Sequence, residues 1–197
     1  MNSTANRLVL ETPRMILRPY QADDYELSRE QMTDPDVVKY ITGEVLSEDK
    51  LAERISKSLD RSICGNLGIW VLIDRETQEK LGTAVLLPTP ENEIEAQWSD
   101  IDLTTISPQA KIEVGYILTK PAWGKGYATE SCTRLIEFGF EETPLEVIWA
   151  VTDPENTASQ HVLRKSGLQD DGQIVAYKEI LPLFKVTKYN WLIAKQS

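Results

Sequence analysis

The sequence predicts an α+β (mixed α/β) fold built around a mixed sheet. Apolar runs typical of strands alternate with helical patterns along most of the 197 residues, so both kinds of element should share one core. Two strand pairs are joined by short turns and read as hairpins, which indicates a mixed sheet rather than a purely parallel one. The chain is 41% hydrophobic and 26% charged, which is typical of globular proteins. Its length suits a single domain over residues 1–197.

The net charge and the cysteine content indicate which partners and which cellular compartment to expect. A net charge of −10 argues against nucleic acid as the main partner, because phosphate binding needs a basic face. It fits a cationic substrate, or solubility alone. No apolar run is long enough for a membrane span, and the polar start Met1–Asn6 does not resemble a signal peptide. Cys64 and Cys132 form no disulfide framework, so we expect a cytoplasmic protein.

The first third of the chain predicts one strand followed by three helices. Residues 14–19 read as a strand that a proline closes. A helix is expected over 23–33 and a short one over 35–40, where an aspartate caps and a proline starts the first turn. Ser47 begins the third helix, because its hydroxyl is followed by acidic residues that favour a helix start. This helical block should form one wall of a cleft.

The middle of the chain predicts a hairpin and a long loop. Apolar runs at 67–74 and 81–87 flank the polar turn 75–79, which indicates two buried antiparallel strands. The segment 88–110 is acidic and contains three prolines. We expect it to be a long loop near a functional site.

A strand, a glycine-containing turn and a helix form the centre of the sequence. The strand 112–118 is followed by the turn 123–126 and by a helix over about 126–142. The first N–H groups of such a helix lack internal partners and lie at the positive end of its dipole, so the turn predicts an anion site. It is not a P-loop, because Gly-x4-Gly-Lys-Ser/Thr is absent. It is a poor dinucleotide motif, because Thr129 stands in place of the third glycine.

The last third of the chain predicts alternating strands and a helix. We expect a strand over 145–152, a helix over 157–165 that ends at Ser166-Gly167, and closing strands over 174–178 and 184–192 joined by a turn around Leu181-Pro182.

Six blocks of sequence match one family pattern. They are residues 10–19, 33–37, 81–84, 113–118, 123–130 and, as the last block, 153–159 followed by 162–168. The last two blocks, in this order, are the most specific part of the pattern. On these residues the chain resembles the GNAT acyltransferases, and within them the branch of ribosomal-protein alanine N-acetyltransferases (RimJ/RimL-like).

The resemblance implies a splayed, mostly antiparallel sheet of about six or seven strands with helices on both faces. It also implies acetyl-CoA as the acetyl donor, with no metal, and an amine as the acceptor. The acceptor is a peptide N-terminus, such as that of a ribosomal protein, or alternatively a small amine or an antibiotic. A non-catalytic acyl-CoA-binding module is a further alternative. The protein should act as a monomer or a homodimer, away from nucleic acid and membrane.

The resemblance also assigns the cofactor contacts. It places the pyrophosphate on the glycine turn and the pantetheine arm along the preceding strand, where it pairs like an extra strand. Pro121 stands where the family usually has a polar or basic residue, which removes one side-chain contact. The residues expected at the cofactor are Ile117, Leu118, Thr119, Trp123, Gly124, Lys125, Gly126, Tyr127, Ala128, Thr129, Asn156 and Arg164.

Acyl transfer from a thioester to an amine needs a neutral amine, a polarised carbonyl and a proton for the leaving thiolate. Ser159 is the candidate acid: it shares a helix face with Asn156, and the resembled branch has a serine near the CoA sulfur. The alternative is a helix-start serine that bonds only backbone. Glu113 is the candidate base, expected on the strand face opposite Val114; the alternative is a solvated edge carboxylate. His161, the only histidine, and Cys132 are expected to be structural.

Overall fold

One eight-stranded sheet organises the protein in the computed structural model, which describes residues 8–62, 66–89 and 106–196. The strand order is β1-β2-β3-β4-β5-β6-β8-β7, and only the β5–β6 pair is parallel. The mixed, mostly antiparallel sheet is confirmed, with eight strands in the described residues instead of six or seven. The strands are β1 (Leu10–Glu11), β2 (Met15–Pro19), β3 (Gly68–Asp74), β4 (Lys80–Pro88), β5 (Ile112–Leu118), β6 (Val147–Val151), β7 (Gln169–Ala176) and β8 (Glu179–Thr187).

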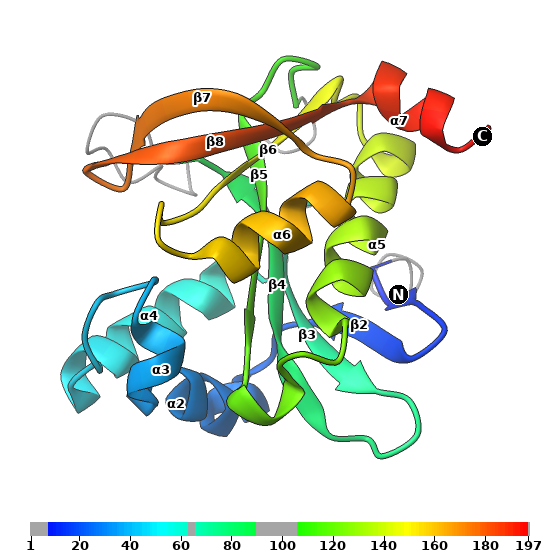
Figure 1. Ribbon diagram of the computed structural model, residues 1–197. Coiled ribbons are helices and arrows are strands. Elements are labelled where there is room, and N and C mark those ends of the chain that lie inside the picture. Colours follow the sequence, from blue (N-terminus) through cyan, green and yellow to red (C-terminus); the bar gives the residue numbers. More distant parts are fainter. Residues whose placement is uncertain (1–7, 63–65, 90–105, 197) are drawn as a thin grey trace.

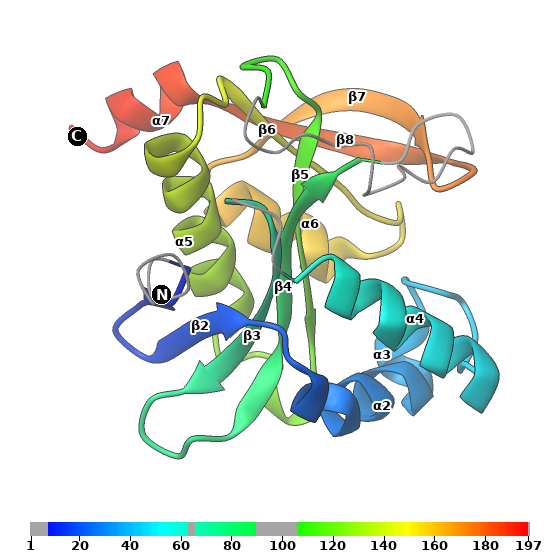
Figure 2. The ribbon, with the colours of Figure 1, turned by 180° about the vertical axis from the view of Figure 1, so that it is seen from behind.

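Helices cover both faces of the sheet. Figures 1 and 2 show α2, α3 and α4 gathered on one side of the strands β2–β5 and α5 on the other. None of the helices in the described ranges combines the length and the apolar character that crossing a bilayer requires. The helices are η1 (Ala22–Asp24), α2 (Tyr25–Thr33), α3 (Pro35–Val38), α4 (Glu48–Asp60), η3 (Lys120–Ala122), α5 (Tyr127–Glu142), α6 (Thr157–Lys165) and α7 (Lys188–Ala194).

The side chains of β5 alternate between the two helical layers. Val114 and Leu118 belong to the main core, together with Leu135 of α5. Ile117 packs instead against the smaller cluster that contains Leu51 of α4. Because strand side chains alternate, even-numbered residues of β5 face α5 and odd-numbered residues face α2–α4. The predicted placement of Glu113, opposite Val114, is therefore confirmed.

The sheet is splayed between β5 and β6. These parallel strands pair at a single position, Glu113 with Trp149, and then diverge (Figure 1). On the other edge of β5 the Thr119 amide donates to the Leu81 carbonyl at 2.9 Å. Backbone groups of successive strand residues point to opposite edges, so the amides of Tyr116 and Leu118 are directed away from β4. They face the edge of β5 that no longer pairs with β6.

The C-terminal elements differ from the prediction. The hairpin turns at Tyr177-Lys178, Pro182 lies within β8, and residues 188–194 form a helix instead of a strand. Pro182 is tolerated because pairing of β8 with β6 stops at Leu183, so no N–H is required there. The Thr187 hydroxyl accepts the Asn190 amide at 3.2 Å and caps α7.

The other predicted elements lie close to their expected positions, and β1 is an additional strand of two residues. The predicted loop over 88–110 falls largely on residues 90–105, which lie outside the described residues, as does Cys64.

Candidate active site

The glycine turn before α5 has the geometry of an anion site. Gly124 and Gly126 adopt φ angles of +71° and +83°, a left-handed conformation that glycine adopts without steric cost. The first hydrogen bond of α5 runs from the Glu130 amide to the Gly126 carbonyl at 3.1 Å. In the described part of the chain, the amides of residues 124–129 donate no hydrogen bond. They remain available to an anion at the positive end of the helix dipole.

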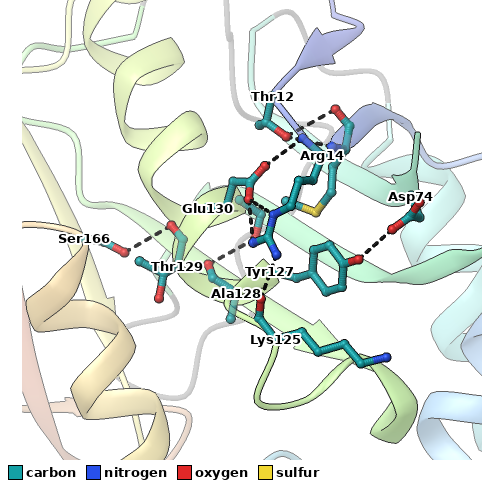
Figure 3. A network of polar contacts seen from close by, with 11 residues as sticks. Thr12, Arg14, Asp74, Lys125, Tyr127, Ala128, Thr129, Glu130 and Ser166 are labelled. Atoms are coloured by element: carbon teal, nitrogen blue, oxygen red, sulfur yellow. Dashed lines mark hydrogen bonds and ion pairs between the residues drawn. The ribbon is translucent and has the colours of Figure 1, made fainter. Parts of the chain in front are cut away.

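An arginine distant in sequence holds this turn. Arg14, the residue before β2, donates from Nη1 to the Lys125 carbonyl at 2.8 Å and forms an ion pair with Glu130 at 2.6 Å. Figure 3 shows its guanidinium among these groups and beside the Tyr127 ring, with the Lys125 side chain directed away. Sequence reasoning missed this role. The available signal was that Arg14 lies in the first block of the family pattern.

The first turn of α6 faces β5 across the splayed edge. Asn156 caps the helix, because its Oδ1 accepts the Ser159 amide at 3.0 Å. The hydroxyls of Ser159 and Tyr116 lie 3.1 Å apart, and the Tyr116 hydroxyl donates to the Ser159 carbonyl at 3.2 Å. Since the tyrosine has one proton, the Ser159 hydroxyl is left to donate to the Tyr116 oxygen. Burial raises the pKa of Tyr116, so its hydroxyl stays protonated.

Glu113 is a buried carboxyl on the opposite face of β5. Its exposed fraction is 7%, so the alternative of a solvated edge carboxylate is wrong. Burial raises its pKa from 4.5 to about 7, although the hydrogen bond from Tyr177 and the nearby Thr89 hydroxyl act in the opposite direction. The Tyr177 hydroxyl donates to Oε1. Oε2 has no hydrogen-bond partner among the described residues, so one oxygen remains free to accept a proton.

Tyr177 occupies an unusual position at the tip of the β7–β8 hairpin. It and Lys178 have φ angles of +53° and +67°, as in a type I′ turn, which usually carries asparagine and glycine. About half of its side chain is exposed, but its hydroxyl reaches the buried Glu113. No sequence pattern predicts this contact, because residues 174–178 are expected to form a strand.

Two predicted cofactor residues are engaged elsewhere. Arg164 forms a two-pronged pair with Asp170, at 3.0 Å from Nε and 2.8 Å from Nη2. The amide and the hydroxyl of Thr119 both donate to the Leu81 carbonyl. Arg164 therefore already has an acidic partner, and its contact with the cofactor stays a prediction.

The backbone amides of β5 that are available to the cofactor differ from those expected. Ile117 points its backbone toward β4, and its carbonyl accepts from Gln31 Nε2 at 2.6 Å. Leu118 and Tyr116 are the residues whose amides face the open edge. Trp123 donates from its indole to the Leu118 carbonyl at 3.1 Å, which fixes the residue that opens the glycine turn.

Cys132 has the structural position expected of it, whereas His161 is a surface residue. Cys132 is fully buried in the main core, and burial raises the pKa of its thiol to about 12. A thiol in this state is not a nucleophile at neutral pH. His161 lies on the exposed side of α6.

Glu113 and Ser159 thus approach the open edge of β5 from opposite faces. A chain lying along that edge would find backbone amides beside it, a carboxyl on one side and a hydroxyl on the other. At the end of the strand it would reach the free amides of the glycine turn. This arrangement suits an elongated ligand with an anionic group and a reactive end.

Comparison with known proteins identifies the family. The family model described as "Acetyltransferase (GNAT) domain" matches residues 14–169. An uncharacterized N-acetyltransferase, p20 of Bacillus licheniformis, is 29% identical over 171 residues, which is 86% of this chain and 87% of that protein.

Two solved structures have the same fold. The aminoglycoside acetyltransferase AAC(6′)-Ib in complex with coenzyme A superposes with a TM-score of 0.70 at 17% identity, covering 92% of this chain and 99% of that one. RimL, a ribosomal L7/L12 α-N-protein acetyltransferase in complex with coenzyme A, gives 0.66 at 13% identity, covering 91% and 97%. The chain therefore belongs to the GNAT acetyltransferase family and is an acetyl-CoA-dependent N-acetyltransferase.

Proposed function

We propose that this enzyme acetylates an α-amine, at the N-terminus of a protein or peptide such as a ribosomal protein, by direct transfer from acetyl-CoA. The observation that carries the proposal is the buried Glu113, whose pKa is raised to about 7. An α-ammonium group has a pKa of about 8, which exceeds that of Glu113 by only about 1, so proton transfer to this carboxylate is slightly unfavourable. The pKa of a lysine-type ammonium exceeds that of Glu113 by more than about 3, so its proton is much harder to remove.

The donor site is formed by the glycine turn and the open edge of β5. The amides of Gly124–Thr129 bind the pyrophosphate, supported by their lack of partners in the described residues. The Leu118 amide pairs with the pantetheine arm, and the Asn156 side-chain amide reaches it from α6. Bound acetyl-CoA supplies a thioester whose carbonyl accepts nucleophilic attack. The Tyr116 amide, two residues further from the glycine turn and beside Ser159, polarises that carbonyl as an oxyanion hole does.

Proton transfer uses the two faces of β5. Glu113 accepts the ammonium proton on its free Oε2, directly or through water, while Tyr177 holds Oε1. Ser159 turns its hydroxyl proton from the Tyr116 oxygen to the departing thiolate, and the Tyr116 hydroxyl, 3.1 Å away, can then donate to the serine oxygen. No covalent enzyme intermediate is required, in agreement with the burial of Cys132.

A second candidate acceptor is a small polycationic amine. It is favoured by the net charge of −10, which attracts a cation to the protein. The relative AAC(6′)-Ib is named for an aminoglycoside acceptor, so the fold accommodates such a molecule. This acceptor would present amines that are harder for Glu113 to deprotonate.

An acceptor panel tests the proposal. Acetyl transfer is measured with acetyl-CoA and four acceptors: a peptide with a free N-terminus, the same peptide N-terminally blocked and carrying a lysine, spermidine, and an aminoglycoside. We expect the highest kcat/KM for the free N-terminus at neutral pH. Preference for the lysine peptide or for either polycation would overturn the α-amine assignment. Binding of CoA without transfer to any of the four acceptors would also overturn the α-amine assignment, because the acceptor would then lie outside the panel.

A further inference from the structure

The start of β2 and the glycine turn meet at one side chain. Arg14 donates from Nη1 to the Lys125 carbonyl at 2.8 Å. Its Nε donates to Glu130 Oε2 at 2.7 Å, and its own amide donates to Glu130 Oε1 at 3.1 Å. The guanidinium also lies 4.6 Å from the centre of the Tyr127 ring. Arg14 thus contacts both the turn and the first helical residues behind it (Figure 3).

We propose that Arg14 is a positioning residue for the donor, which aims the amides of the turn at the pyrophosphate by holding the Lys125 carbonyl. The inference rests on the proposed role of this turn as the pyrophosphate site. The planar trans peptide makes the Lys125 carbonyl and the Gly126 N–H point in opposite directions. Fixing the carbonyl on Arg14 therefore directs the Gly126 amide away from Arg14. It also keeps a carbonyl oxygen, which would repel an anion, out of the site.

The contact of Arg14 with the Lys125 carbonyl must be rigid, because the two flanking glycines allow many backbone conformations. Gly124 and Gly126 allow the intervening peptides to rotate. Arg14 is itself fixed by Glu130, and the Tyr127 ring beneath it is anchored by a hydrogen bond to Asp74 Oδ2 at 2.6 Å. Asp74 in turn accepts the amides at the β3–β4 turn. Three segments far apart in the sequence therefore set the conformation of one peptide.

Arg14 does not act as a free positive charge for the phosphates. Glu130 neutralises it at 2.6 Å. Partial burial of Glu130 opposes its ionisation, but the nearby Thr12 hydroxyl and the hydrogen bonds and charge of Arg14 lower its pKa overall, so it is charged at neutral pH. The pair carries no net charge. Its effect on an anion must come from the geometry that it imposes.

The test uses variants that separate geometry from charge. CoA binding is measured by calorimetry for Arg14→Ala, Arg14→Lys and Glu130→Ala. We expect binding weaker by about tenfold in all three, the size typical of losing a charge-assisted hydrogen bond. Lysine keeps the charge but cannot reproduce the guanidinium fork. Glu130→Ala removes a negative charge near the anion, so a purely electrostatic effect would tighten binding.

A donor without pyrophosphate provides the second readout. The Arg14 variants should lose kcat/KM by about tenfold with acetyl-CoA and keep it with S-acetyl-pantetheine. Arg75→Ala is the matched control, because Arg75 binds the Thr12 carbonyl at 3.0 Å and Glu11 at 3.1 Å in the same segment without contacting the turn. It should leave CoA binding unchanged.

Three results would overturn the inference: wild-type CoA binding in Arg14→Lys, tighter binding in Glu130→Ala, or equal losses with both donors. Gly126→Val tests the pyrophosphate site separately from the positioning role of Arg14. Valine is strained at a φ of +83°, and the valine Cβ would lie 3.3 Å from Arg14 Nη2, so the variant should distort the turn. If Gly126→Val leaves CoA binding unchanged, the turn is not the pyrophosphate site, and both proposals fail. If it weakens CoA binding while the Arg14 variants do not, only the positioning role fails.

Discussion

The hydroxyls of Tyr116 and Ser159 lie 3.1 Å apart and join β5 to the first turn of α6. The contact crosses the place where β6 has separated from β5, so it sets the width of the opening between strand and helix. A second hydrogen bond, from the Tyr116 hydroxyl to the Ser159 carbonyl at 3.2 Å, fixes the tyrosine relative to the helix backbone. The serine oxygen is thereby held in place before any ligand binds.

Ser159→Ala should lower kcat while leaving the affinity for CoA nearly unchanged. General acid catalysis contributes roughly 10²- to 10⁴-fold, and we expect a loss near the lower end, because water can partly replace the hydroxyl. The measurement is steady-state turnover together with calorimetric CoA binding. Tyr116→Phe is the matched control, which should lose less turnover because it leaves the serine hydroxyl in place. Full turnover in Ser159→Ala would show that the serine only caps the helix.

The pH dependence of turnover should report the ionisation of Glu113. In the wild type, kcat should rise with pH through an apparent pKa of about 7, because the base must be ionised. Tyr177→Phe removes a hydrogen bond that lowers this pKa, so the rise should move to higher pH. Profiles of the two proteins are compared with the same acceptor, whose own ionisation is then common to both. An unchanged midpoint, or a shift to lower pH, would contradict the assignment.

Glu113→Gln should stabilise the protein at alkaline pH while it reduces turnover. The folded-state pKa of Glu113, about 7, lies above its ordinary value of 4.5. Folding therefore favours the protonated carboxyl, and this contribution is complete below the ordinary pKa and is lost as the pH rises through about 7. Above that pH the buried carboxylate costs on the order of 3 kcal/mol relative to a neutral group.

Thermal unfolding of wild type and Glu113→Gln at about pH 5 and about pH 8 measures how the stability difference between them changes with pH. The stability advantage of the variant should be larger at the higher pH. A stability difference that does not change with pH would mean that burial does not disfavour ionisation of the carboxyl. Loss of turnover in a variant that is more stable could not be attributed to unfolding.

Gly82→Ala should destabilise the protein through the contact between β4 and β5. Gly82 has a φ of +153°, and a Cβ there would lie 2.3 Å from the Ile117 carbonyl oxygen and 2.8 Å from the Leu118 Cα. Because both atoms belong to the backbone, neither can yield easily, and we expect a loss of about 2–4 kcal/mol. Urea unfolding measures it.

Gly43→Ala is the control, since Gly43 also has a positive φ, +73°, but a Cβ there would contact nothing within 4 Å. It should cost about 1 kcal/mol. Similar losses in both variants would mean that backbone conformation, and not the close approach to β5, limits position 82.

Local patterns predicted the elements around the site well. The apolar run 112–118 corresponds to β5, and the apolar runs 67–74 and 81–87 form the predicted hairpin. Ser47 caps α4 as its hydroxyl indicated. These features depend on periodicity and on capping within a few residues, which a single sequence records directly.

The features that the sequence did not reveal depend on distant contacts. Tyr177 reaches Glu113 only because β7 and β8 turn at residues 177–178, and Arg14 reaches the glycine turn only through the packing of β2 beside α5. The helix α7 contains aromatic and branched apolar residues with high strand propensity, so its pattern resembles a strand. Arg164 looked like a free cation because its partner, Asp170, belongs to β7 and not to the same helix.

The single-position contact between β5 and β6 has a consequence for solvent exchange along β5. The amides of Ile117 and Thr119 face β4, whereas those of Tyr116 and Leu118 face the splayed edge. Deuterium uptake in the free enzyme should therefore alternate residue by residue, slow at odd positions and fast at even ones. If the donor covers these two amides as we propose, acetyl-CoA should slow exchange at the fast sites alone, as an added strand would.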